Sequence, residues 1–139
     1  MLIKPLRDSF IMPTKGSSNA AAFDIYMPEA GTADCHSRFY SLGFAAAIPV
    51  GHVGLLLPRS GVGAKHGVEL NNTCGVIDAD FRGEWRAAIR TKDGLFFSWE
   101  AGERLLQCVV VPVLSVNLVL TDELDPTDRG DGGFGSSGV

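Results

Sequence analysis

The sequence predicts an all-β domain, built as a sandwich or a barrel. Apolar and polar residues alternate along several short stretches, as they do on half-buried strands. Clusters of Gly, Pro, Asn and Asp separate these stretches about every 8–12 residues, a spacing typical of sandwiches and barrels. Only residues 99–107 could pass for a helix, and Gly102 weakens that interpretation.

The expected strands follow from these patterns. Residues 42–48 place four apolar side chains on one face: Leu42, Phe44, Ala46 and Ile48. Residues 53–57 form a short apolar run that Pro58 ends. Residues 84–91 alternate plainly, with Trp85, Ala87 and Ile89 on one side and Glu84, Arg86 and Arg90 on the other. Residues 71–85 are interpreted as a hairpin. Residues 108–120 are apolar on both faces and contain Pro112, which indicates two buried strands or one long bulged strand.

Composition limits the classes of protein. The 139 residues suffice for one domain with its own core, and 45% apolar and 20% charged residues are ordinary for a globular chain. A net charge of −4 and the lack of a Lys/Arg run argue against nucleic-acid binding. Cys35, Cys74 and Cys108 form no CxxC pair and no zinc-ligand spacing with histidine, which favours reduced thiols in the cytoplasm. The N-terminal MLIKPLRDSF resembles no signal peptide, and we expect no membrane segment.

The last eleven residues, Arg129 to Val139, contain five glycines and can build no core. They have what an arm closing over a phosphorylated nucleotide needs. Glycine backbone approaches phosphate, Arg129 can bind phosphate bidentately, and Phe134 offers a flat face to a base. A frayed, solubilising tail is the alternative interpretation.

Two internal segments carry groups suited to a phosphate ester. Arg59, Ser60 and Gly61 follow an expected strand and offer a guanidinium, a hydroxyl and an unobstructed N–H in succession. A structural turn would explain that segment equally well. Asp78 comes directly after the apolar pair Val76-Ile77, where a solvated surface charge is less expected.

Five segments together resemble, in order and spacing, the motifs of the trimeric dUTP diphosphatase (dUTPase) family. They are AAFDI at 21–25, PRSGVGAKHG at 58–67, GVIDADFRGEW at 75–85, GERLLQ at 102–107 and RGDGGFGSSG at 129–138. The resemblance implies a distorted β-clip or jelly-roll barrel over residues 1–126, with a mobile closing arm at 127–139. It also implies a cytoplasmic homotrimer with active sites between subunits. The implied reaction is hydrolysis of dUTP to dUMP and pyrophosphate, which keeps uracil out of DNA and supplies dUMP for thymidylate synthesis.

The resemblance also implies roles for single residues. Asp78 would be the catalytic base that activates the water attacking the α-phosphorus, and it would also contact the sugar 3′-hydroxyl. Phosphate contacts would come from Arg59, Ser60, Gly61 and Gln107, and from Arg129, Gly135, Ser136 and Ser137 once the arm closes. Mg²⁺ would be held by the triphosphate and water, without direct protein ligands. Asp24 is expected to be structural and to pair with Arg104.

Uracil and deoxyribose recognition would fall on the segment around Asp78. The implied base contacts are Asn72, the backbone of Gly75, Val76 and Ile77, and a stacked Phe134. Phe81 stands where most members of the family have Tyr; its ring can still exclude ribose, but a phenol hydrogen bond is lost. Ala22 replaces the usual glycine of the first motif. Arg86 is a weaker substrate candidate, because a solvated strand face explains it equally well.

Other functions remain to be weighed. A dCTP deaminase shares the fold but would need a different acid–base arrangement around Asp78. A non-catalytic, nucleotide-regulated binding module is another alternative, although a decayed site should have lost one of Ser60, Asp78, Gln107 and Arg129. A purely structural β-sandwich is the third.

Overall fold

The computed structural model describes residues 1–133 and confirms the all-β class. One short helix, α1 (Ser60–His66), interrupts the strands. The strands are β1 (Leu2–Pro5), β2 (Ala22–Tyr26), β3 (Gly31–Ala33), β4 (Arg38–Ser41), β5 (Phe44–Ala47), β6 (His52–Pro58), β7 (Val68–Leu70), β8 (Gly75–Ile77), β9 (Arg86–Thr91), β10 (Phe97–Trp99) and β11 (Arg104–Pro112).

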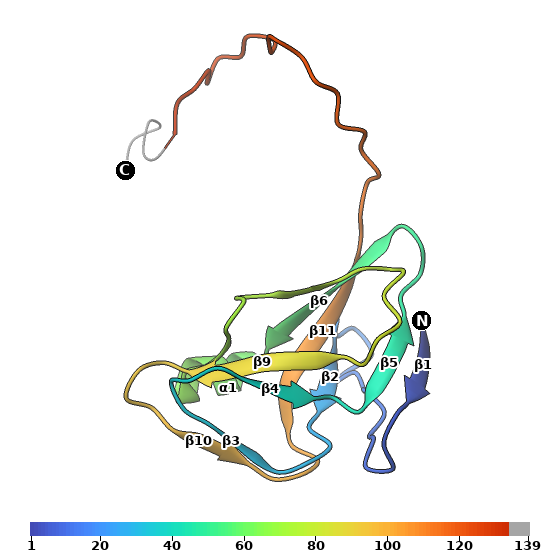
Figure 1. The fold of residues 1–139 in the computed structure, drawn as a ribbon, viewed down its shortest axis with the longest axis vertical. Coiled ribbons are helices and arrows are strands. Elements are labelled where there is room, and N and C mark those ends of the chain that lie inside the picture. The colour runs from blue at the N-terminus through green and yellow to red at the C-terminus, as the bar shows by residue number, and fades with distance from the viewer. Residues whose placement is uncertain (134–139) are drawn as a thin grey trace.

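The strands form a small barrel-like body of antiparallel sheets (Figure 1). The largest sheet has the order β2-β11-β6-β8, and a second has the order β4-β9-β7; β1 pairs with β5 and β10 with β3. The core lies between these sheets. Its largest fully buried side chains include Trp85, Phe44, Leu56, Ile89 and Leu106. Burial of such side chains is the main favourable contribution to folding.

The alternating patterns are confirmed by burial. Trp85, Ala87 and Ile89 are at most 2% exposed, while Arg86 on the same stretch is exposed. Leu42, Phe44, Ala46 and Ile48 are all buried as expected. The stretch 42–48 is nevertheless shorter as a strand than the pattern suggests. Gly43 has a φ of +79°, which ends β4 and reorients the chain before β5.

Residues 71–85 do not form a hairpin, contrary to the expectation. Strand β7 pairs with β9, whereas β8 pairs with β6, so the turn at residues 71–74 joins two different sheets. Residues 99–107 are not helical either: they end β10, turn through Gly102 at a φ of +87°, and begin β11. The helix lies instead at residues 60–66, within a segment that the sequence analysis treated as a turn.

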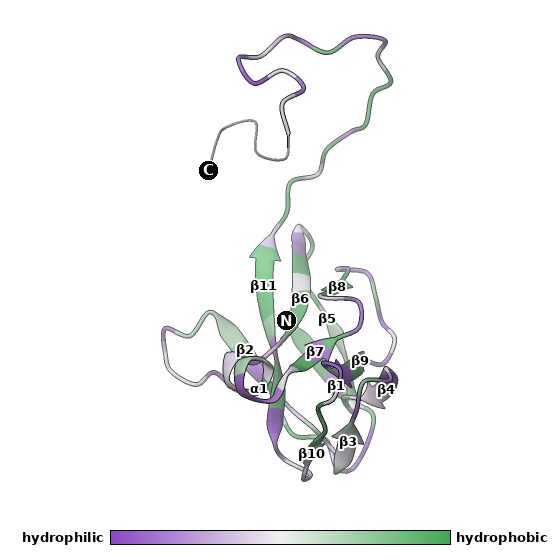
Figure 2. Cartoon of the chain, turned by 90° about the vertical axis from the view of Figure 1, so that its left-hand side faces the viewer, coloured by the Kyte–Doolittle hydropathy of each residue, from purple (hydrophilic) through white to green (hydrophobic). Residues whose placement is uncertain are grey.

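Strand β11 ends at Pro112, so the apolar run that begins at Cys108 is a strand only over its first part. The C-terminal extension, residues 113–133, leaves the body and turns away from it (Figure 1). Leu118, Val119 and Leu120 are between 81% and 99% exposed, so these residues are not buried in a single chain. Figure 2 shows the hydrophobic colouring of β11 continuing into this segment. Within residues 1–133, no helix has the length and hydropathy to cross a membrane.

Candidate functional site

A cavity of about 990 Å³ opens where β6 ends and β11 begins. Its walls include Arg59, Ser60, Gly61 and Gln107, four of the residues expected to contact phosphate. Arg59 is the residue before α1, and its backbone N–H donates to the Leu105 carbonyl at 2.9 Å. The start of α1 is therefore fastened to β11, which brings two segments far apart in the sequence to one cavity.

The charge in the cavity is organised around Asp24. This carboxylate is only 8% exposed and binds two guanidinium groups: Arg59 Nε at 2.9 Å and Arg104 Nη1 at 3.1 Å. The expected pairing of Asp24 with Arg104 is confirmed, and Arg59 is a second partner. Arg59 also donates through Nη1 to the Arg104 carbonyl at 3.1 Å. The ion pair with Asp24 and this hydrogen bond hold the Arg59 guanidinium in position, and its other N–H groups remain for an anionic ligand.

Gln107 and Ser60 supply neutral donors beside these cations. Gln107 lies in β11, opposite Asp24 on β2 and Leu57 on β6. Its Nε2 donates to the Pro58 carbonyl at 3.1 Å, which orients the amide and leaves one N–H for a ligand. The Ser60 side chain is exposed, and its hydroxyl makes no hydrogen bond within residues 1–133. The cavity thus combines a fixed guanidinium, an amide and a hydroxyl, which together suit phosphate oxygens.

The far end of the cavity is formed by residues that are not among the predicted site residues. Lys65 and His66 close the last turn of α1, and the His66 ring packs at 4.9 Å from that of Phe97 in β10. Residues 61 and 65 lie on the same side of a helix, four positions apart. An interpretation of residues 60–66 as a helix would therefore have placed Lys65 beside Gly61. The glycines in that segment concealed the helix.

The residues expected to recognise the base and the sugar lie elsewhere on the chain. Asn72 is exposed in the turn after β7, and its Nδ2 donates to the Cys74 carbonyl at 3.2 Å. Asp78 follows β8 and is exposed. Phe81 is 44% exposed and packs over Gly83, where a Cβ atom would lie 2.6 Å from the ring. None of Asn72, Asp78 and Phe81 lines the large cavity.

The two groups of residues share one face of the four-stranded sheet. Side chains of directly paired residues point to the same face, and two rows cross the sheet there: Gln107 with Leu57, and Val109 with Leu55 and Val76. The opposite face carries the buried Leu56 and Cys108. Val76, which is one of the expected base contacts, is 65% exposed. The cavity and the segment carrying Asp78 therefore flank a largely apolar strip of exposed sheet.

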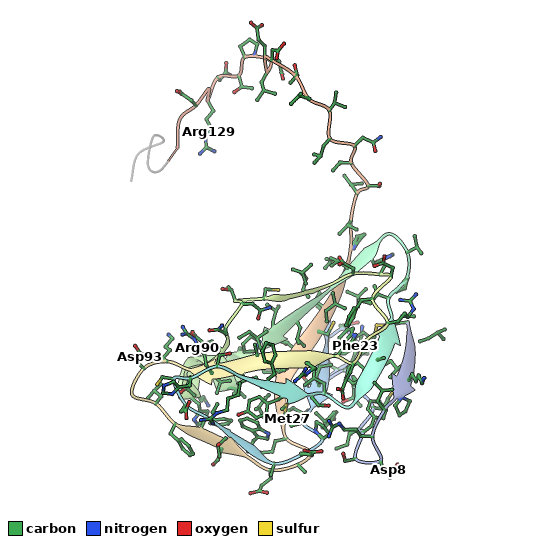
Figure 3. All side chains as sticks on the ribbon, viewed as in Figure 1. Asp8, Phe23, Met27, Arg90, Asp93 and Arg129 are labelled. Atoms are coloured by element: carbon green, nitrogen blue, oxygen red, sulfur yellow. The ribbon has the colours of Figure 1, made fainter. Side chains whose placement is uncertain are left out.

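The remaining expected site residues are scattered. Arg86 begins β9 and lies over the Phe39 ring at 5.3 Å, in a separate cavity of about 260 Å³ that it shares with Arg7 and Glu84. Arg129 lies on the C-terminal extension away from the body (Figure 3), where its Nε donates to the Gly132 carbonyl at 2.8 Å. Four expected residues lie outside the described part of the chain: Phe134, Gly135, Ser136 and Ser137.

Three comparisons place the chain among known proteins. The family model described as dUTPase matches residues 8–138. The chain belongs to the dUTPase family. Its relatives include proteins named deoxyuridine 5'-triphosphate nucleotidohydrolase. The one from Syntrophotalea carbinolica is 40% identical over 98% of this chain and 95% of its own, and the one from Candida albicans is 38% identical over 91% and 80%.

Solved structures of dUTPases share the architecture. The dUTPase of Staphylococcus bacteriophage 80alpha, solved with dUPNHPP, aligns with a TM-score of 0.91 at 28% identity. The alignment covers 99% of this chain and 98% of the phage protein. The G164S mutant of that dUTPase, solved with dUpNHpp, aligns with a TM-score of 0.89 and the same coverage. The distorted jelly-roll fold expected from the five motifs is thus confirmed.

Proposed function

We infer that this member of the dUTPase family hydrolyses dUTP to dUMP and pyrophosphate. The observation that carries the inference is the cavity at the end of β6, where Arg59, Ser60, Gly61 and Gln107 meet as the family motifs require. Hydrolysis of dUTP removes the precursor of uracil in DNA and supplies dUMP for thymidylate synthesis. The predicted cytoplasmic location suits this role in nucleotide metabolism.

We propose Asp78 as the catalytic base. It accepts a proton from a water molecule as that water attacks the α-phosphorus, and the bond from the α-phosphorus to the oxygen bridging it to the β-phosphorus breaks. Pyrophosphate leaves and dUMP remains. An exposed carboxylate directly after β8 is free to hold such a water, because no described side chain occupies it with an ion pair. Arg59, Ser60 and Gln107 stabilise the charge on the phosphate oxygens.

The substrate in this proposal is the Mg²⁺ complex of dUTP. Within residues 1–133, no group of three or more His, Cys, Asp or Glu side chains is arranged to hold a metal ion. Hard oxygen ligands on the triphosphate, with water, are what Mg²⁺ prefers. The ion therefore enters with the nucleotide, and the cations of the cavity neutralise the charge that remains.

We propose that the complete site forms between subunits of a homotrimer. In one chain, Asp78 and the cavity are separated by strand β6 and by the apolar strip of the sheet. That strip and the exposed Leu118–Leu120 segment are apolar surfaces that association would cover. One subunit supplies the cavity and another supplies residues 72–81. The closing arm, residues 127–139, comes from a further copy and carries Arg129 to the phosphates.

Base and sugar selection belong to residues 72–81 in this proposal. Asn72 and the backbone of Gly75 to Ile77 read the uracil edge, and a tight turn rejects the 5-methyl group of thymine by collision. The exposed Phe81 ring supports the deoxyribose and leaves no room for a 2′-hydroxyl. Phe134 on the closing arm stacks on the base. Arg86 lies in the separate cavity beside Phe39, and its contact with the substrate stays a prediction.

The first experiment measures pyrophosphate release from dUTP, dCTP, dTTP and UTP with Mg²⁺, for the wild type and for Asp78→Asn. Rapid release from dUTP alone, lost in Asp78→Asn while nucleotide binding persists, is expected. Deleting residues 128–139 should remove most activity without unfolding the body. Ammonia release from dCTP would show that the protein is a deaminase and not a diphosphatase. If no nucleotide is turned over, a non-catalytic binding module becomes the better interpretation.

A second experiment tests whether the site is shared. Asp78→Asn damages one half of the site and Arg59→Gln the other, so each variant alone should be inactive. Co-expression in equal amounts should restore about one quarter of the wild-type activity, because random assembly pairs an intact residue 78 with an intact residue 59 at that frequency. A site contained in one chain gives no recovery. Light scattering on the same samples reports whether the assembly is trimeric.

A further inference from the structure

The net charge of the protein resides entirely in its C-terminal part. Of 12 Lys and Arg and 16 Asp and Glu residues, only Arg129 and five acids follow residue 120. The first 120 residues hold 11 of each sign and are neutral. The acidic segment, residues 122–131, contains Asp122, Glu123, Asp125, Asp128 and Asp131. It therefore carries the whole charge of −4.

This negative charge opposes the proposed closure of the arm over an anionic substrate. The proposed closure brings Arg129 to a triphosphate, and the same movement brings the acidic segment toward a strongly anionic substrate. All five carboxylates are exposed, and within residues 1–133 none makes an ion pair. A cation on the body that receives part of the acidic segment therefore favours closure.

Lys65 has the position and the charge for this contact. Among the cations lining the large cavity, Arg59 and Arg104 are both paired with Asp24. Lys65 lines the same cavity, is exposed, and makes no ion pair within the described residues. It occupies the last turn of α1, while the phosphate-binding Ser60 and Gly61 occupy the first. An acid can thus reach Lys65 without displacing the phosphates.

The lengths allow Asp125 to reach Lys65. Ser60 and Lys65 are separated along α1 by about 7.5 Å, at 1.5 Å per residue. Asp125 and Arg129 are four residues apart, a reach of up to about 13 Å in extended chain. An arm that seats Arg129 beside Ser60 can therefore bring Asp125 to Lys65 without full extension. Asp128, adjacent to Arg129, stays too close to the phosphate end.

We propose that the acidic segment of a second copy docks on the Lys65 end of the cavity, with Asp125 paired to Lys65. This contact is an electrostatic latch: it offsets the repulsion between the acidic segment and the triphosphate, and it fixes the register in which the arm closes. The inference rests on the proposed closure of the arm over a neighbouring site. His66 and Phe97 form the wall beside the latch.

Charge reversal tests the latch. Lys65→Glu and Asp125→Lys should each lower kcat/KM for dUTP about fivefold at low salt, and the double variant should return to within about twofold of the wild type. The sign of the single Asp125→Lys effect is decisive. Simple attraction between the arm and the triphosphate predicts a gain from an added cation, whereas the latch predicts a loss.

Two controls make the result specific. Lys92→Glu, on an exposed loop residue that does not line the cavity, should leave kcat/KM unchanged and should not rescue Asp125→Lys. Trypsin cleavage after Arg129, measured by mass spectrometry with a non-hydrolysable dUTP analogue bound, reports arm closure directly. It should be slow in the wild type and the double variant and fast in each single variant.

Additive single effects, or faster turnover with Asp125→Lys, would overturn the latch. An inactive wild type would instead overturn the proposed function, so the two failures are distinguishable. The coupling between Lys65 and Asp125 should also disappear at about 0.5 M salt, because the Debye length there falls below about 5 Å. Coupling that persists unchanged at high salt would contradict an exposed ion pair.

Discussion

Replacing Asp24 by Asn removes the charge that holds two segments of the cavity together. The carboxylate is 8% exposed and binds Arg59 at 2.9 Å and Arg104 at 3.1 Å. The amide oxygen of Asn can keep one of these two contacts, but the amide presents N–H to the other guanidinium. Losing one charge-assisted hydrogen bond costs about 1.5–3 kcal/mol. The Arg59 and Arg104 side chains are 34% and 43% exposed and can rehydrate, which reduces the loss to about 1–2 kcal/mol.

Thermal unfolding followed by circular dichroism measures this loss. For a chain of this size, about 1–2 kcal/mol corresponds to a fall in Tm of about 3–8 °C. Because Arg59 then loses its fixed orientation, KM for dUTP should rise more than kcat falls.

The matched control is Asp34→Asn, which breaks a shorter ion pair, 2.7 Å to Arg38, on a side chain that is 32% exposed. Its Tm should change less, and its KM should be unchanged. Equal Tm changes for the two variants, or an Asp24→Asn enzyme with wild-type KM, would refute the reasoning.

Three further predictions concern other parts of the fold. Burial raises the pKa of the Cys108 thiol to about 11, so the thiol reagent DTNB at pH 8 should label Cys108 only after unfolding. Because the thiol ionises more readily in the unfolded chain, the free energy of unfolding should fall as the pH rises from about 9 toward 11. The hydrogen bond from Ser41, and after it the one from Arg7, lowers the pKa of Glu84. The free energy of unfolding, measured by urea titration, should therefore fall as the pH drops below about 4. This fall should be smaller in Glu84→Gln. Gly31→Ala places a Cβ 2.4 Å from Cζ2 of the buried Trp99 and should cost about 1–3 kcal/mol in the free energy of unfolding, without a change in KM.

Local patterns predicted the strands but not their partners. Alternation correctly identified β9, because one face of that strand is buried and the other is polar. A short apolar run ended by Pro58 identified β6. The sequence of residues 71–85 alone does not show that β8 pairs with β6 and β7 with β9, because both partner strands lie outside the segment. A turn-rich sequence between two short strands therefore looked like a hairpin. The helix α1 was missed because two of its seven residues are glycines, which local propensity disfavours.

The candidate site was predictable in its parts but not in its assembly. The motifs marked Arg59, Ser60, Gly61 and Gln107, and the structure brings these four to one cavity. Lys65 was not identified, because its relation to the site depends on the helix. The exposure of residues 113–120 shows a limit of a different kind. Their apolar composition predicted buried strands, but in the single chain these residues are exposed and lie beyond the end of β11 at Pro112.

The turn at residues 71–74 is the shortest covalent link between strands of the two larger sheets, and it belongs to the segment proposed to read the base. One of its flanking strands is hydrogen-bonded into each sheet. A nucleotide bound there restrains both sheets through one short stretch of backbone. Slower amide hydrogen exchange on binding should therefore extend to β9 and β6, well beyond the atoms that touch the base. Binding of a small base would in this way stabilise both of the larger sheets against local unfolding.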